Sequence, residues 1–464
     1  MKTKLTFLFF SIGLCLLAQT PKDPAFKTVS TKDLLTQTTK ESLFEYMKSA
    51  TIYEVNVRQF SKEGTFEKVT NDLPRLKKMG VDIVWLMPIH PIGVKNRKGS
   101  LGSYYAVKDY KGVNPEFGDL SDFKALVKKA HKLKMKVIID WVANHSSPDN
   151  VWLEQGFKAW YTLDSNGNVQ PTIGTDWWDV ADLNFDNSLM RRNMILSMKY
   201  WITEADIDGF RCDVAGSVPM DFWVEARTEL QEVKPLIMLA EAEGPEMHEA
   251  FDITYGWELH HLLNKLAQGK IDPTDLATYL EKDINYPLQA FRMYFTSNHD
   301  ENSWQGTEME RMGPARHAMA VLCYALNGMP LIYNGQETSL DRRLAFFEKD
   351  EIDWEKMDLV SFYKKLNNLK KNNPAVFGDR MNSALDLKIL NDGKLIVIMR
   401  KSKLNPKAIC QFIINLSDQD QSLASVEFLD GKYKHVFKRQ QVKIKSGDAS
   451  AVLKPWGFMV LERH

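Results

Sequence analysis

Short apolar segments alternate with amphipathic segments from about residue 50 to residue 377. The segment 82–89 (DIVWLMPI) is apolar throughout, as expected of a strand that is buried on both faces. In the segment 122–135, apolar residues from Phe123 to Leu133 recur at helical spacing and lysines occupy the opposite face. Eight segments have strand character, and they are 51–60, 82–89, 136–142, 209–215, 236–241, 253–257, 292–300 and 329–335.

Eight strands that alternate with helices predict an α/β fold of the (β/α)₈ TIM-barrel type. An open, doubly wound sheet is the alternative, because the number of strands does not establish closure. No glycine-rich phosphate loop follows the first strand, which weakens this alternative.

Two regions depart from the alternating pattern. Residues 146–186 are rich in Trp, Asp, Asn and Gly without a clear period, which predicts a short inserted domain after the third strand. From residue 378 the chain has strand-like segments without helices between them, which predicts a C-terminal all-β sandwich over 378–464. The barrel is therefore expected over 50–377. The predicted C-terminal strands are 394–400, 408–417, 426–430, 435–444 and 451–463.

The first residues predict export. Lys2 and Lys4 precede an apolar run from residue 5 to residue 17, which is typical of a signal peptide over 1–18. Cys15 raises the alternative of a lipoprotein, but the bulky Leu14 disfavours it. Residues 19–49 are expected to form an N-terminal extension. A periplasmic or extracellular protein is predicted, and no other apolar segment approaches the ~20 residues that span a membrane.

The composition excludes several partners. The 60 basic and 60 acidic residues cancel, so no overall field favours nucleic acid or an anionic membrane. Cys212, Cys323 and Cys410 have no metal-ligand spacing and are interpreted as buried packing thiols.

Acidic residues lie at or near the ends of several predicted strands, directly after their apolar runs. Asp140, Asp213, Glu241 and Asp300 each lie where an apolar run ends, and this is the catalytic edge of a parallel barrel. One such acid could simply cap the next helix, but four together favour a catalytic site.

The types and spacing of these residues suggest a reaction. Arg211 and Asp213 are two apart on a strand and point the same way, so the guanidinium is expected to lower the pKa of a nucleophilic Asp213. Glu241, close to other carboxylates, could stay protonated as a general acid. Two carboxyl groups about 5 Å apart perform retaining glycoside hydrolysis, and Asp300 could bind sugar hydroxyls in the transition state.

The sequence resembles the α-amylase family of glycoside hydrolases (family 13) over nearly all of residues 50–464. The resemblance rests on seven motifs in the family's order. They are GVDIVWLMP (80–88), DWVANH (140–145), VADLN (180–184), GFRCD (209–213), LAEAE (239–243), TSNHDEN (296–302) and GMPLIYNGQE (328–337).

This resemblance implies Asp213 as nucleophile, Glu241 as acid/base and Asp300 as transition-state stabiliser. Glu243 is the alternative acid, although family members place the acid directly at the strand end. The same matches imply Arg211 as an orienting cation and His299, with Asp300, as a transition-state stabiliser, and both Arg211 and His299 as substrate-binding residues.

Further matches imply residues that bind sugar and metal. Tyr105 matches the tyrosine that stacks on the sugar at the cleaved bond, with core packing as the alternative. His145 matches a substrate-binding histidine. Asn144 and Asp182 match two calcium ligands of the family and offer oxygen donors, although Asn144 could instead hold its loop by hydrogen bonds.

The sequence also departs from the family. Many members have a Lys-His pair shortly after the nucleophile, where this chain has Gly216 and Ser217. Together with the short excursion, this difference favours a substrate smaller than starch. Trp177, Trp178 and Trp304 are candidate sugar platforms, with loop packing as the alternative.

We therefore expect a retaining hydrolase that cleaves α-1,4-glucosidic bonds in maltooligosaccharides or starch fragments. An α-1,6-acting glucosidase or a transglycosylase is the alternative, because the same carboxylates serve these reactions. A non-catalytic sugar-binding protein is disfavoured because all the acids are present. Calcium is the only cofactor implied.

Overall fold

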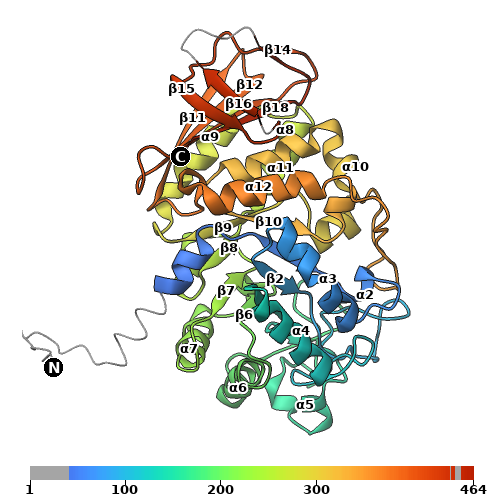
Figure 1. Ribbon diagram of the computed structural model, residues 1–464. Coiled ribbons are helices and arrows are strands. Elements are labelled where there is room, and N and C mark those ends of the chain that lie inside the picture. Colours follow the sequence, from blue (N-terminus) through green and yellow to red (C-terminus); the bar gives the residue numbers. More distant parts are fainter. Residues whose placement is uncertain (1–40, 439, 445–450, 464) are drawn as a thin grey trace, which may run out of the picture.

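The computed structural model describes residues 41–438, 440–444 and 451–463 (Figure 1). Its central feature is a closed barrel of eight parallel strands in the order β1-β10-β9-β8-β7-β6-β3-β2, which confirms the predicted barrel. The strands are β1 (Ile52–Val55), β2 (Ile83–Leu86), β3 (Lys136–Trp141), β6 (Gly209–Cys212), β7 (Ile237–Ala240), β8 (Ile253–Tyr255), β9 (Phe291–Tyr294) and β10 (Met329–Tyr333). The predicted signal peptide lies outside the described residues.

Helices pack around this barrel. Residues 41–47, from the predicted N-terminal extension, are helical, and Met47 lies in the core cluster of the barrel interior. The further α-helices are α2 (Val57–Phe60), α3 (Phe66–Met79), α4 (Leu120–Lys132), α5 (Val151–Glu154), α6 (Ser188–Ala205), α7 (Met220–Gln231), α8 (Trp257–Ala267), α9 (Thr274–Glu281), α10 (Glu308–Met312), α11 (Arg316–Ala325) and α12 (Val360–Asn372).

Local sequence signals explain where these helices begin and end. Helix α3 ends at Gly80, whose φ of 99° lies in the left-handed region that glycine adopts without strain. Asp119 and Asp122 form a capping box at the start of α4. The Asn187 side chain accepts hydrogen bonds from two backbone amides at the start of α6.

The first strand of the barrel is shorter than the sequence predicts. It was expected over 51–60, but β1 ends at Val55 and residues 57–60 form the helical turn α2. The side chain of Asn56 caps this turn by accepting a hydrogen bond from the amide of Gln59. A capping residue within an apolar run therefore ended the strand.

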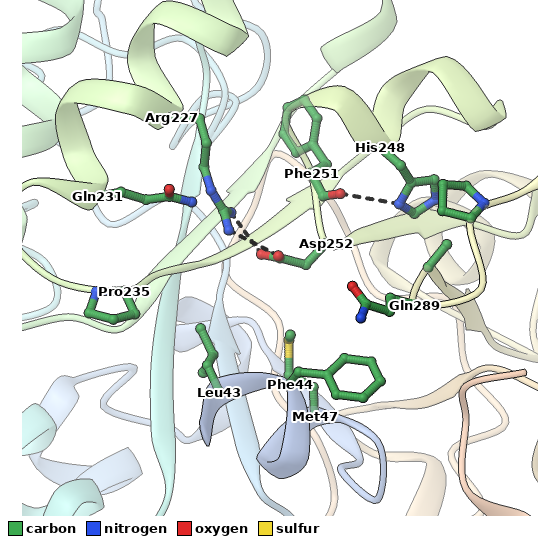
Figure 2. Close-up of a pocket in the computed structure, with 12 residues that line it drawn as sticks. Leu43, Phe44, Met47, Arg227, Gln231, Pro235, His248, Phe251, Asp252 and Gln289 are labelled. Carbon is green, nitrogen blue, oxygen red and sulfur yellow. Dashed lines mark hydrogen bonds and ion pairs between the residues drawn. The ribbon is translucent and has the colours of Figure 1, made fainter. Parts of the chain in front are cut away.

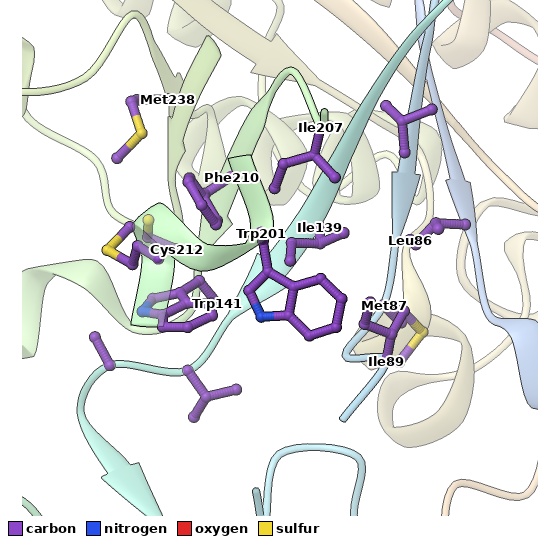
Figure 3. Close-up of a cluster of buried hydrophobic side chains, with 14 of the residues drawn as sticks. Leu86, Met87, Ile89, Ile139, Trp141, Trp201, Ile207, Phe210, Cys212 and Met238 are labelled. Atoms are coloured by element: carbon purple, nitrogen blue, oxygen red, sulfur yellow. The ribbon is translucent and has the colours of Figure 1, made fainter. Parts of the chain in front are cut away.

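The pleat of the strands separates two cores. On β1, Ile52 belongs to a cluster inside the barrel, whereas Tyr53 and Val55 belong to a larger cluster between the strands and the helices. Figure 3 shows part of this larger cluster, in which Trp201 of α6 lies near Ile139 of β3. Side chains of one parity therefore line the barrel interior up to its carboxyl end.

The C-terminal region is all-β, as predicted. Six antiparallel strands form one sheet in the order β11-β12-β13-β18-β15-β16, and β14 and β17 form a small second sheet. Their bounds are β11 (Ser383–Leu390), β12 (Leu395–Ser402), β13 (Ile409–Asn415), β14 (Gln421–Ser422), β15 (Gly431–His435), β16 (Gln440–Ile444), β17 (Val452–Leu453) and β18 (Phe458–Arg463).

One face of the six-stranded sheet packs on the barrel domain. Ile396 and Phe412 share a core cluster with Leu322 of α11 and Leu366 of α12, so the sheet lies beside these helices (Figure 1). The small sheet covers the other face through residues such as Leu453.

Several details of the C-terminal prediction are wrong. The single strands expected over 435–444 and 451–463 are each interrupted, because β15 ends at His435 before β16 begins at Gln440, and β17 ends at Leu453 before β18 begins at Phe458. Residues 426–430 were expected to form a strand, but this segment pairs with no other strand among the described residues, and β15 begins at Gly431. Val426 is buried nevertheless, so its apolar character reflects packing rather than strand pairing. The edge strand β11 was not identified from the sequence, because polar residues interrupt its apolar pattern.

The excursion after β3 is small and partly ordered by hydrogen bonds. Strands β4 (His145–Ser146) and β5 (Ala181–Asp182) pair in antiparallel fashion and close its base.

Over the described part of the chain, no helix combines the length and apolar character needed to cross a membrane.

Candidate active site

The predicted catalytic residues converge at the carboxyl end of the barrel. Arg211 lies on β6, and Asp213 follows that strand directly. Glu241 follows β7, Asp140 lies near the end of β3, and Asp300 follows β9 by six residues. Because parallel strands end at one edge, residues far apart in the sequence meet at this mouth.

Arg211 is the centre of this group. Its Nη1 lies 2.9 Å from Asp140 Oδ1 and 3.0 Å from Asp213 Oδ1, and its Nη2 lies 2.7 Å from Glu241 Oε1. Its Nε donates a hydrogen bond of 3.2 Å to the Tyr255 hydroxyl. The side chain of Arg211 is fully buried, so one guanidinium fixes three carboxyl groups relative to one another.

The carboxyl groups differ in their access to solvent. The Asp140 side chain is fully buried, whereas those of Asp213, Glu241 and Asp300 are 10%, 12% and 36% exposed. A substrate can therefore reach the three residues to which the sequence analysis assigned catalysis. Asp140 is instead a fully buried partner of Arg211.

Burial dominates the electrostatics of the acids. It raises the pKa of Asp213 well above its usual value, with a further increase from the charge of Glu241, and Arg211 opposes both effects. Burial likewise raises the pKa of Asp140 to about 6. Arg211 does lower the pKa of Asp213, as expected, but the net shift is upward because burial and the charge of Glu241 outweigh the guanidinium.

His299 is held between two acids. Its Nδ1 lies 2.5 Å from Glu54 Oε1, and its Nε2 lies 3.3 Å from Asp300 Oδ2. Burial alone would lower the pKa of His299, but the charges of Asp300 and Glu54 and the hydrogen bond to Glu54 raise it to about 9. His299 is therefore an imidazolium at neutral pH, and both of its nitrogens donate.

Tyr105 is packed against His299. The two rings are stacked with centroids 5.5 Å apart, and the tyrosine hydroxyl lies 2.7 Å from His299 Nε2. The same hydroxyl donates a hydrogen bond of 3.1 Å to Asp140 Oδ2. Tyr105 is thus part of the carboxylate site and not only of the core.

The two predicted calcium ligands lie close to each other and to His145. The Asn144 amide donates hydrogen bonds to Thr172 Oγ1 and His145 Nδ1, both at 3.1 Å. Asp182 pairs with His145 across β4 and β5, and its carboxyl group accepts hydrogen bonds from Thr162 and Thr172. Burial lowers the pKa of His145 to about 4, so this imidazole is neutral.

The donor set around Asn144 and Asp182 includes one carboxylate. The Asn144 nitrogen faces Thr172. In the part of the chain that the structure describes, no three His, Cys, Asp or Glu side chains are grouped as metal ligands.

Several residues of the site were missed by the sequence analysis. They include Glu54 from β1, Trp85 from β2 and Tyr255 from β8. The Nε1 of Trp85 donates a hydrogen bond of 3.2 Å to Asp140 Oδ2. Phe346 lies in the loop after β10 and stacks on Tyr105. The alternation of inward-facing and outward-facing side chains along β1 and β2 could have identified Glu54 and Trp85, because both occupy positions that face the barrel interior.

The other candidates occupy more peripheral positions. Glu243 pairs with Arg292 at 3.0 Å, so this acid is engaged in a separate ion pair. Gly216 and Ser217 are exposed after β6. Trp177 packs against His145, whereas Trp178 and Trp304 are 57% and 49% exposed.

A pocket lies at the opposite end of the barrel from the carboxylate site (Figure 2). Its Asp252 precedes β8, and Arg227 binds this carboxylate with both terminal nitrogens at 2.8 and 3.0 Å. Asp252 also accepts from the amide of Met238, at 2.8 Å. The acid of this pocket is therefore already paired with an arginine and a backbone amide, which is typical of the structural end of such a barrel.

Comparisons with known proteins agree with this geometry. The family model described as "Alpha amylase, catalytic domain" matches residues 36–384. Alpha-amylase MalA of Haloarcula japonica is 28% identical over 356 residues, which are 72% of this chain and 50% of that protein. The chain therefore spans about half the length of this curated relative.

Two solved structures are similar over most of the chain. An α-amylase from Lactobacillus plantarum is 31% identical with a TM-score of 0.80, and the match covers 90% of this chain and 99% of that protein. The maltogenic α-amylase AmyB from Thermotoga neapolitana is 32% identical with the same TM-score and the same coverage.

The contact between Glu54 and His299 can be tested in the free protein. Replacing Glu54 with Gln removes a negative charge beside the imidazolium, so the pKa of His299 should fall from about 9. Titration of ¹³C-labelled histidine by NMR measures this value. An unchanged pKa in Glu54→Gln would show that Asp300 alone holds the proton on His299.

Proposed function

Because the chain belongs to the α-amylase family of glycoside hydrolases, we propose that it hydrolyses α-1,4-glucosidic bonds in maltooligosaccharides or starch fragments with retention of configuration. The observation that carries this proposal is the guanidinium of Arg211, which binds Asp213 and Glu241 through neighbouring nitrogens. Sharing one guanidinium keeps the two carboxyl groups close, which favours the separation of about 5 Å typical of retaining enzymes.

In the first step, Asp213 attacks the anomeric carbon and Glu241 donates a proton to the departing glycosidic oxygen. The C–O bond to the leaving sugar breaks, and an ester forms between the enzyme and the glucosyl group. In the second step, Glu241 takes a proton from water, the water oxygen attacks the same carbon, and Asp213 leaves. Each step inverts the carbon once, so the configuration is retained.

Acids outnumber bases in this site. Within the described part of the chain, Asp140, Asp213, Glu241, Asp300 and Glu54 surround the two cations Arg211 and His299. The raised pKa of Asp213 indicates that the cluster binds a proton that isolated carboxyl groups would release. Catalysis requires an ionised Asp213 to attack and a proton on the acid that assists the leaving group.

Asp300 and His299 complete the site. Both point to the region beside Tyr105, where a protonated His299 and an ionised Asp300 can bind neighbouring hydroxyl groups of the same sugar. These bonds strengthen as the ring flattens toward the oxocarbenium state. An α-1,6-acting or transglycosylating enzyme would use the same groups, and the products from maltoheptaose and pullulan distinguish these reactions.

For Asn144 and Asp182 we favour a hydrogen-bonding role. Thr172 accepts from Asn144 and donates to Asp182, so its hydroxyl group links the segment after β3 to β5. Bound calcium is the alternative, in which the oxygens of both residues would hold the ion and tie the excursion to the barrel.

The stereochemistry of the product tests the proposed reaction. Proton NMR of a maltooligosaccharide digest should show the α-anomer first, followed by slow mutarotation. Early appearance of the β-anomer would contradict double displacement at Asp213.

The acid/base role can be separated from the nucleophilic role. Glu241→Gln should slow substrates with poor leaving groups by about 10²–10⁴-fold and slow activated aryl α-glucosides far less, because a good leaving group needs no proton. The matched control, Asp213→Asn, should slow both classes alike, since every substrate needs the nucleophile. Equal losses for both classes in Glu241→Gln would remove Glu241 from this role.

The hydrogen-bonding role of Asn144 and Asp182 predicts no dependence on calcium. Thermal unfolding should show the same Tm in EDTA and in millimolar calcium, whereas Asp182→Asn should lower it because a charged acceptor is lost. A lower Tm in EDTA that calcium restores would instead establish a metal site.

A further inference from the structure

A row of aromatic rings continues outward from Tyr105. Phe346 stacks on Tyr105 with an interplanar angle of 13°, and Trp304 lies against Phe346 with ring centroids 5.2 Å apart. Phe347 contacts both Phe346 and Trp304, at 5.1 and 5.7 Å. We call Trp304, Phe346 and Phe347 the aromatic shelf. Trp304 at its outer end is about half exposed, so the shelf presents a free apolar surface.

The shelf is next to the catalytic groups in the sequence as well as in space. Trp304 follows Asp300 by four residues, within a π-helical turn over Glu301–Gln305. Such turns are rare and often occur at functional sites. The turn places the Trp304 ring against the loop after β10, so Asp300 and the shelf share one short segment.

Hydrogen bonds hold this turn to the loop after β10. The Asn302 side chain donates to the carbonyl of Arg342 at 3.2 Å and accepts from the amide of Leu344 at 2.9 Å. The Ser303 hydroxyl donates to the carbonyl of Leu344, also at 2.9 Å. Three bonds therefore fix the two segments that carry the rings.

The far part of the loop is also anchored. The Gln59 side chain donates to the carbonyl of Ala345 at 2.7 Å, and the amide of Leu101 donates to the carbonyl of Phe347 at 3.1 Å. The Trp354 indole donates to the carbonyl of Phe60 at 2.6 Å. The rings are thus held in place before any ligand binds, which lowers the entropic cost of binding.

We propose that the aromatic shelf is a binding subsite for one glucose unit of an oligosaccharide whose neighbouring unit lies against Tyr105. The apolar C–H face of a pyranose ring covers the exposed face of Trp304, and its hydroxyl groups remain in water. The shelf thereby selects chains over single glucosides. This inference rests on the proposed α-glucan substrate and adds a residue that determines chain-length preference.

Kinetics with a long and a short substrate test the shelf. In Trp304→Ala, kcat/KM should fall at least about tenfold more for maltohexaose than for 4-nitrophenyl α-glucoside, because only the chain reaches Trp304. Trp304→Phe should recover most of this ratio. The control Phe157→Ala removes an exposed ring that stacks on Trp160 in the excursion and should leave the ratio unchanged.

Equal losses for both substrates in Trp304→Ala would assign Trp304 to packing and overturn the inference. If the wild-type enzyme hydrolyses neither substrate, the proposed reaction fails, and calorimetry with maltohexaose still tests the shelf. Binding that weakens about tenfold or more in Trp304→Ala would then support it. Unchanged binding, or none to the wild-type enzyme, would overturn it.

Discussion

The catalytic end of the barrel depends on one buried cation. The guanidinium of Arg211 lies inside the barrel, because Arg211 occupies a position on β6 whose side chain faces the interior. There Trp85 and Tyr255 lie against it, with the central guanidinium carbon 5.0 and 5.6 Å from their ring centroids. Leaving this charge unpaired in the core would be very costly, so the acids that surround it are a structural requirement as well as a catalytic resource. Asp140 is the fully buried partner of the cation, whereas Asp213 and Glu241 remain partly accessible to solvent.

The second cation, His299, has its own acidic partners. Glu54 and Asp300 face His299 and favour protonation of the imidazole, whereas the charge of Arg211 opposes it. Tyr105 connects the two cations, because its hydroxyl contacts both Asp140 and His299. A change at any of these residues should therefore alter the protonation of the whole cluster rather than of one group.

The sequence allowed much of this site to be predicted, and the reason is geometric. Each parallel strand delivers the residue after its apolar run to the same edge, so Asp213, Glu241 and Asp300 could be grouped without coordinates. Glu54 and Phe346 could not be found in this way: the first lies inside an apolar strand, and the second lies in a loop whose path depends on tertiary contacts. The direction of the Asp213 pKa shift also required the structure, since burial and shared partners are not visible in the spacing of residues.

The same geometry explains why chemistry and specificity can be separated in this molecule. Arg211, Asp213 and Glu241 project from strands, whose positions the whole barrel fixes. Trp304 and Phe346 belong to segments between the strands and the helices, which are held by a few side-chain hydrogen bonds such as those of Asn302. Substitutions in these segments can therefore change which chains are bound while the guanidinium and its carboxylates keep their arrangement.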